Sequence, residues 1–108
     1  MKYSLQGGIQ LIRSEASIQV QFGVAILITI AGLYYNISRT EWIAQILCIG
    51  LVMTAEGLNT AIEGIADFIH PDFHEKIGRI KDIAAGAVGI AALASVIVAG
   101  IIYIPRIF

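Results

Sequence analysis

The chain contains one cysteine and two histidines among 108 residues, and only 14% of its residues are charged. A single cysteine, Cys48, excludes an internal disulfide framework and any metal site built from a cysteine cluster. So few charges exclude intrinsic disorder, and they also exclude an ordinary soluble domain, which carries about 25% charged residues. The net charge of −1 offers no basic patch, so nucleic acid is not expected as a partner.

Hydrophobic residues make up 57% of the chain, and they gather between blocks of charge. Twenty-three uncharged residues separate Glu15 from Arg39, and another 23 separate Asp82 from Arg106. Each run is long enough for a helix that crosses a bilayer, which needs about 20 apolar residues. We therefore predict transmembrane helices over about residues 18–36 and 82–105.

A further uncharged run lies between Glu41 and Glu56, but its 14 residues cover only about 21 Å as a helix. The apolar pattern continues past Glu56 at helical spacing, and Pro71 follows it. This pattern predicts a third membrane helix over about residues 40–69. At 100° per residue its polar side chains return to one face. They are Glu56, Asn59, Thr60, Glu63 and Asp67.

Residues 2–15 form a short amphipathic stretch, with Leu5, Ile9 and Ile12 on one side. This pattern is typical of a helix that lies at the membrane interface.

The prediction for residues 1–108 is thus one all-α, multi-pass membrane domain. Five Lys and Arg residues on the side of the amino terminus, against two on the other, place the amino terminus in the cytoplasm.

The predicted helices bring charged groups to one depth, at the cytoplasmic edge of the hydrocarbon. A carboxylate at this depth is costly unless it is paired or used in function. Carboxylate oxygens suit Mg²⁺, which on the cytoplasmic side suggests a nucleotide phosphate, and a carboxylate can also accept a proton from a lipid alcohol. Phosphoryl transfer from ATP to a lipid hydroxyl combines these features. The groups are Glu15, Glu56, Glu63, Lys81 and Asp82.

The chain has no G-x-x-x-x-G-K-[ST] loop and no protein-kinase glycine loop, so the residues alone leave other functions open. Glu56, Asn59 and Glu63 are also consistent with a structural hydrogen-bond cluster between helices. A small multidrug transporter has a similar length and a membrane glutamate. That alternative predicts four spans with a glutamate in the first, whereas this sequence predicts three spans.

Two motifs resemble signatures of one protein family. Residues 55–63, AEGLNTAIE, resemble the E-x-x-N-[ST]-A-I-E signature of the integral-membrane prokaryotic diacylglycerol kinases. Residues 73–82, FHEKIGRIKD, resemble their H-x-x-x-G-R-x-K-D signature. The resemblance covers nearly the whole chain. It implies a homotrimeric bundle of three-helix subunits in the bacterial cytoplasmic membrane, with active sites shared between neighbouring subunits on the cytoplasmic side.

The resemblance also implies a reaction and roles for single residues. ATP, with Mg²⁺, would phosphorylate the primary hydroxyl of diacylglycerol to give phosphatidic acid, or in some members the hydroxyl of undecaprenol. Glu56 matches the proposed general base, and Glu15 and Glu63 match magnesium ligands. Ser4, Glu56 and Asn59 match substrate contacts. The residues that match nucleotide contacts are Tyr3, Glu15, Glu63, Asp72, Phe73, His74, Lys81 and Asp82.

Overall fold

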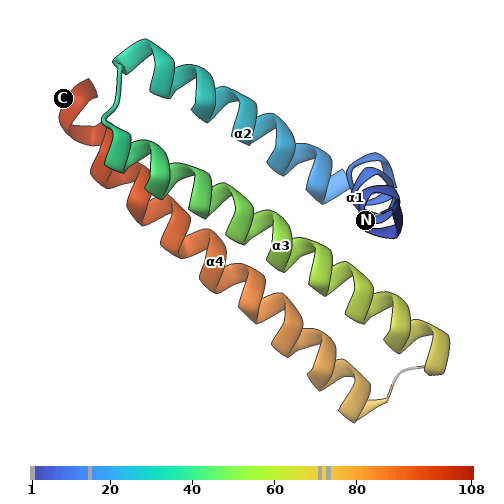
Figure 1. Cartoon of the computed structure of the whole chain (residues 1–108). Helices are drawn as coiled ribbons and strands as arrows, with labels where there is room; N and C mark the ends of the chain where they lie inside the picture. Colours follow the sequence, from blue (N-terminus) through green and yellow to red (C-terminus); the bar gives the residue numbers. More distant parts are fainter. Residues whose placement is uncertain (1, 15, 71, 73) are drawn as a thin grey trace.

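The computed structural model describes residues 2–14, 16–70, 72 and 74–108, which form an all-α chain (Figure 1). Within these residues, three helices are long and apolar enough to cross a membrane, and a shorter helix precedes them. The prediction of three candidate spans and a short amino-terminal helix is therefore confirmed. The helices are α1 (Lys2–Ser14), α2 (Ala16–Tyr35), α3 (Arg39–Ile69) and α4 (Glu75–Ile107).

The bounds of α2 and α3 agree with the prediction to within two residues, but α4 begins seven residues before the predicted residue 82. His74 caps α4, because its Nδ1 accepts a hydrogen bond from the Lys76 N–H at 3.1 Å. The charged residues that follow are Glu, Lys and Arg, all good helix formers, so the helix extends past the apolar run. Lys81 and Asp82 consequently lie inside α4 and not just before it.

A tight turn joins α2 to α3. Asn36 has a positive φ of 51°, and the Ile37 N–H donates to the Gly32 carbonyl at 3.2 Å, as in a Schellman helix end. Ser38 then caps α3. Its Oγ accepts from the Glu41 N–H at 3.1 Å, while Glu41 Oε1 accepts from the Ser38 N–H at 2.9 Å. This capping box pairs the backbone N–H groups of Ser38 and Glu41, so α3 can begin directly after the turn.

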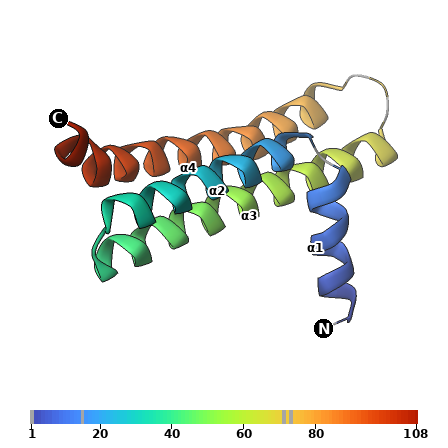
Figure 2. The ribbon, with the colours of Figure 1, turned by 90° about the horizontal axis from the view of Figure 1, so that it is seen from above.

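Helices α2, α3 and α4 run side by side, and α1 leads away from them (Figures 1 and 2). Small side chains lie where α4 meets α3: Ala84 and Ala91 are buried, and Ser95 Oγ donates to the Cys48 carbonyl at 3.5 Å. Small residues let two helix backbones approach closely in a membrane, where packing replaces the hydrophobic effect between helices. Small side chains of α4 therefore pack against α3.

The buried core lies at the end of the bundle that holds the α2–α3 turn. Ile37, Ile102 and Tyr103 form its centre. The Tyr103 hydroxyl donates to Gln45 Oε1 at 2.5 Å, and Gln45 Nε2 donates to the Ile28 carbonyl at 3.3 Å. Polar groups buried in this way are hydrogen-bonded in stable proteins, and here they join all three long helices.

Candidate functional site

The polar stripe of α3 begins near one edge of the hydrocarbon. α3 has 31 residues and is about 46 Å long, whereas the hydrocarbon is about 30 Å thick. Counted from Arg39, Glu56 lies about 26 Å along the helix and Glu63 about 36 Å. Glu56 is half-buried and Glu63 is exposed. With Arg39 at one boundary of the hydrocarbon, Glu56 is expected near the other boundary and Glu63 beyond it, on the same helix face.

Asn59 lies between these two carboxylates in the sequence and is hydrogen-bonded to the second. Its Nδ2 donates a hydrogen bond to Glu63 Oε1 at 3.0 Å. Its Oδ1 is buried and has no hydrogen-bond partner among the described residues. An unpaired buried acceptor costs about 1–3 kcal/mol. A donor or a cation supplied by a ligand would remove that cost, so the Asn59 amide is placed to meet a bound group.

Lys81 of α4 reaches the same side of α3. Its Nζ lies 2.5 Å from Asp67 Oδ1, and the two side chains are 35% and 60% exposed. Asp67 lies one turn beyond Glu63 on the polar stripe. The structure thus brings Lys81 to the acidic face of α3 but pairs it with Asp67. The sequence placed Asp67 on this stripe without giving it a role, although its spacing of four from Glu63 was a visible signal.

The loop between α3 and α4 holds further predicted nucleotide contacts. The His70 Nδ1–H donates to the Asp72 backbone carbonyl at 2.8 Å, and the rings of His70 and His74 lie 5.1 Å apart. The side chains of Asp72 and His74 are exposed, as is that of Asp82 in α4. Phe73 lies outside the described residues. This end of the bundle is therefore polar and open to a soluble ligand.

The amino-terminal contacts are not brought to this site within the chain. Tyr3 and Ser4 are exposed on α1, which carries them away from the α3–α4 loop (Figures 1 and 2). Glu15, the predicted second magnesium ligand, lies outside the described residues. The residues that the structure does bring together are those of α3 and α4.

The donor types on this face fit Mg²⁺. In the described part of the chain, no group of three His, Cys, Asp or Glu side chains lies close enough to hold a metal alone. Mg²⁺ is usually bound by one or two carboxylates together with substrate phosphates and waters. The Glu63 carboxylate and the unpaired Asn59 Oδ1 are hard oxygen donors of this kind. Magnesium held jointly by the protein and a nucleotide is therefore compatible with the site.

Comparisons with known proteins agree on one family. The family model described as prokaryotic diacylglycerol kinase matches residues 2–103. A Bacillus subtilis protein named undecaprenol kinase is 36% identical over 95 residues, covering 88% of this chain and 77% of that protein. Proteins named diacylglycerol kinase from Synechocystis and Escherichia coli K12 are 39% and 37% identical over 84 and 78 residues.

The match covers 77% and 71% of this chain for the last two relatives. It spans only 47% of the Synechocystis protein and 64% of the Escherichia coli protein. The family model, in contrast, extends over all four helices except the last residues of α4. The chain therefore belongs to the prokaryotic diacylglycerol kinase family, whose members are lipid kinases of the membrane.

Proposed function

We propose that this chain transfers the γ-phosphoryl group of ATP to the primary hydroxyl of diacylglycerol, giving phosphatidic acid and ADP. The observation that carries this proposal is the position of Glu56. Its carboxylate is half-buried at the membrane boundary, on the face of α3 that also holds the hydrogen-bonded pair Asn59 and Glu63. A lipid hydroxyl lies at this depth, and ATP reaches the same face from the water.

Glu56 acts as the general base in this proposal. Its carboxylate accepts the proton of the lipid hydroxyl, whose oxygen forms a new bond to the γ-phosphorus. The bond from the γ-phosphorus to the bridging oxygen breaks, and ADP leaves with that electron pair. Lys81 neutralises charge on the phosphates, and Asn59 positions Glu63. Glu63 and Glu15 would hold Mg²⁺, which would supply further neutralisation of phosphate charge.

The remaining predicted contacts surround these groups. Asp72, Phe73 and His74 would contact the nucleotide from the α3–α4 loop, and Asp82 would do so from α4. Tyr3 and Ser4 belong to α1, which leads away from α3 and α4 of its own chain (Figure 2). Their position supports a homotrimer in which neighbouring subunits complete one another's sites. The excess of Lys and Arg on the amino-terminal side supports a cytoplasmic active site in the bacterial membrane.

Undecaprenol is the second candidate acceptor, and the Bacillus subtilis relative that is named for it favours this alternative. Diacylglycerol and undecaprenol both present a primary hydroxyl at the membrane boundary. The same base and the same phosphate contacts serve either reaction. The transporter alternative is set aside, because the chain belongs to a family of kinases.

The variant Glu56→Gln tests the role of Glu56, because glutamine keeps the shape of the side chain and cannot accept the proton. We expect kcat to fall by about 10²- to 10⁴-fold, the contribution of a positioned general base. The assay follows label from γ-labelled ATP into lipid, and the control is Glu75→Gln, an exposed acid in the first turn of α4. A Glu56→Gln enzyme with nearly unchanged kcat would rule out Glu56 as the base.

A further inference from the structure

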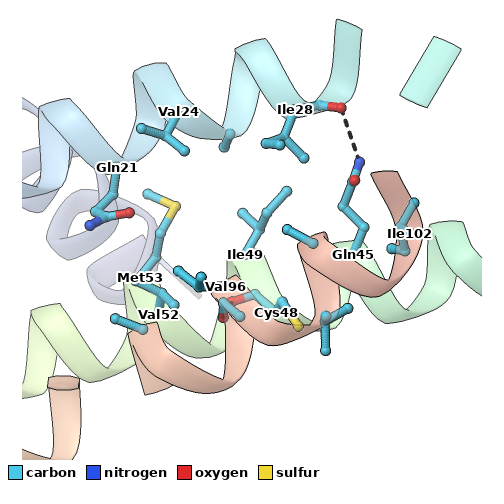
Figure 3. A pocket seen from close by; sticks show the side chains of 15 residues that line it. Gln21, Val24, Ile28, Gln45, Cys48, Ile49, Val52, Met53, Val96 and Ile102 are labelled. Atoms are coloured by element: carbon cyan, nitrogen blue, oxygen red, sulfur yellow. Dashed lines mark hydrogen bonds between the residues drawn. The ribbon is translucent and has the colours of Figure 1, made fainter. Parts of the chain in front are cut away.

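The face of α3 that carries the proposed base changes character along its length. Towards the α2–α3 turn, Ile49 and Val52 line an apolar cavity of about 330 Å³ between the three long helices (Figure 3). Towards the α3–α4 loop, the same face carries Glu56, Glu63 and His70 at spacings of seven residues. Seven residues make nearly two full helical turns, so these side chains share one face at intervals of about 10 Å along the axis. A soluble nucleotide bound on this face therefore lies towards the loop.

Helix α4 repeats this spacing beside α3. His74, which caps α4, and Lys81 are also seven residues apart, and the rings of His70 and His74 lie 5.1 Å from each other. The two rings therefore lie about two helical turns from Glu63 and Lys81, the groups proposed to meet the phosphates. In ATP the ribose and the α-phosphate separate the base from the terminal phosphates. A nucleotide whose terminal phosphates meet Glu63 and Lys81 can thus place its base at the two histidine rings.

The hydrogen bonds of the two rings fix where their protons lie. The His70 Nδ1–H donates to the Asp72 carbonyl at 2.8 Å, so Nε2 of the neutral ring carries a lone pair and no proton. The His74 Nδ1 accepts from the Lys76 N–H at 3.1 Å, so Nε2 of that neutral ring carries the proton. Within the described residues, neither Nε2 atom makes a hydrogen bond. The loop thus offers a ligand one acceptor and one donor on adjacent rings.

This pair of groups matches an edge of adenine. Adenine carries an amino donor next to a ring-nitrogen acceptor, whereas guanine has an oxygen acceptor in place of the amino group. We propose that His70 Nε2 accepts a hydrogen bond from the adenine amino group and that the His74 Nε2–H donates to the adjacent ring nitrogen, so that the loop selects ATP over GTP. This inference rests on the proposed function and adds His70, which lies outside both signature motifs, as a residue that reads the base. A site that hydrogen-bonds a substrate group discriminates against an analogue that lacks the group.

The contact to the amino group is tested with ATP and purine riboside triphosphate, which differs from ATP only in lacking that group. The assay follows phosphatidic acid formed from labelled dioleoylglycerol, so either nucleotide can be the donor. We expect the wild type to prefer ATP in kcat/KM by about tenfold, the effect of one hydrogen bond. His70→Asn should lose this preference, because asparagine can still donate to the Asp72 carbonyl but has no atom in the place of Nε2. His70→Gln should keep it, because its Oε1 takes the place of the Nε2 acceptor.

GTP provides a second comparison in the same assay. Its oxygen acceptor would face the lone pair of His70 Nε2, so we expect the wild type to discriminate against GTP at least as strongly as against purine riboside triphosphate. His70→Asn should narrow the difference between ATP and GTP. The matched control is Glu75→Gln, which changes an exposed side chain directly after His74 and should leave both nucleotide ratios unchanged.

An ATP preference that is the same in the wild type and in His70→Asn would overturn the role of His70. A preference lost in both His70→Asn and His70→Gln would assign it to packing of the ring on the base and would overturn the hydrogen bond. A wild type that uses all three nucleotides equally well would overturn the inference about the base and leave the proposed function standing. A wild type that transfers phosphate from none of them to lipid would overturn the proposed function itself.

Discussion

The Lys81–Asp67 ion pair shows how a single residue of the site is held before a nucleotide arrives. Both side chains are partly in water, at 35% and 60% exposure, and an ion pair of this kind contributes only about 0–1 kcal/mol. A triphosphate carries more negative charge than one carboxylate and can displace it from the ammonium group. If Lys81 contacts the phosphates, as we propose, Asp67 competes with ATP for Lys81.

The variant Asp67→Asn removes this competitor while keeping the size of the side chain. We expect KM for ATP to fall by up to about fivefold, with the larger effect at low ionic strength because salt screens exposed charges. The measurement is the dependence of the transfer rate on ATP concentration at two salt concentrations, with Glu75→Gln as the control. An unchanged or higher KM in Asp67→Asn would show that Asp67 does not compete with the nucleotide.

One of the contacts between α2 and α3 is made at a glycine. Gly32 of α2 lies against the ring of Trp42, and a Cβ atom at Gly32 would come within 2.7 Å of the Trp42 Cη2 atom. The ring packs directly on the α2 backbone, beside the buried Ile37. A larger residue at position 32 can fit only if the tryptophan or the helix moves.

We therefore expect Gly32→Ala to destabilise the protein by about 1–3 kcal/mol, the usual cost of overfilling a packed site. Gly23→Ala is the matched control in the same helix, because no atom lies within 4 Å of a Cβ at that position. Thermal unfolding in detergent measures both. Equal melting temperatures for the two variants would contradict the packing of Trp42 on Gly32.

Most of the helix bounds could be predicted from the sequence. An uncharged run of 23 residues is long enough to cross the bilayer, and inside the bilayer a helix provides the hydrogen bonds that its backbone N–H and C=O groups need. The predicted start of α4 at residue 82 is seven residues too late, because the apolar run begins there whereas Glu, Lys and Arg before it also favour a helix. The capping box of Ser38 and Glu41 was visible in the sequence as S-x-x-E. The Lys81–Asp67 and Tyr103–Gln45 contacts were not predictable, because they depend on how α4 is rotated against α3.

The whole molecule exposes large apolar side chains on all its long helices. Leu27 on α2, Leu47 on α3 and Ile90 on α4 are 67%, 66% and 73% exposed. A soluble monomer rarely exposes contiguous apolar patches larger than a few hundred Å². Lipid, together with other copies of the chain, is expected to cover these surfaces. In the proposed trimer, a site shared between subunits would then form where the copies meet.

Mixing two impaired variants tests a shared site. Glu56→Gln lacks the proposed base on α3, and Tyr3→Ala lacks a proposed nucleotide contact on α1, which leads away from α3 and α4 of its own chain (Figure 2). If these groups act across a subunit interface, oligomers refolded from a mixture contain some sites with both residues intact. We expect activity well above that of either variant refolded alone. Activity no greater than the sum of the separate variants would show that Glu56 and Tyr3 act within one chain.

The most direct measurement is phosphate transfer by the purified wild-type protein in mixed micelles, with γ-labelled ATP and with diacylglycerol or undecaprenol supplied separately. We expect label to enter phosphatidic acid, transfer to require Mg²⁺, and diacylglycerol to be preferred. A preference for undecaprenol would contradict the choice of acceptor. Transfer to neither lipid by folded protein would contradict the assignment of Glu56, Asn59 and Glu63 to lipid phosphorylation.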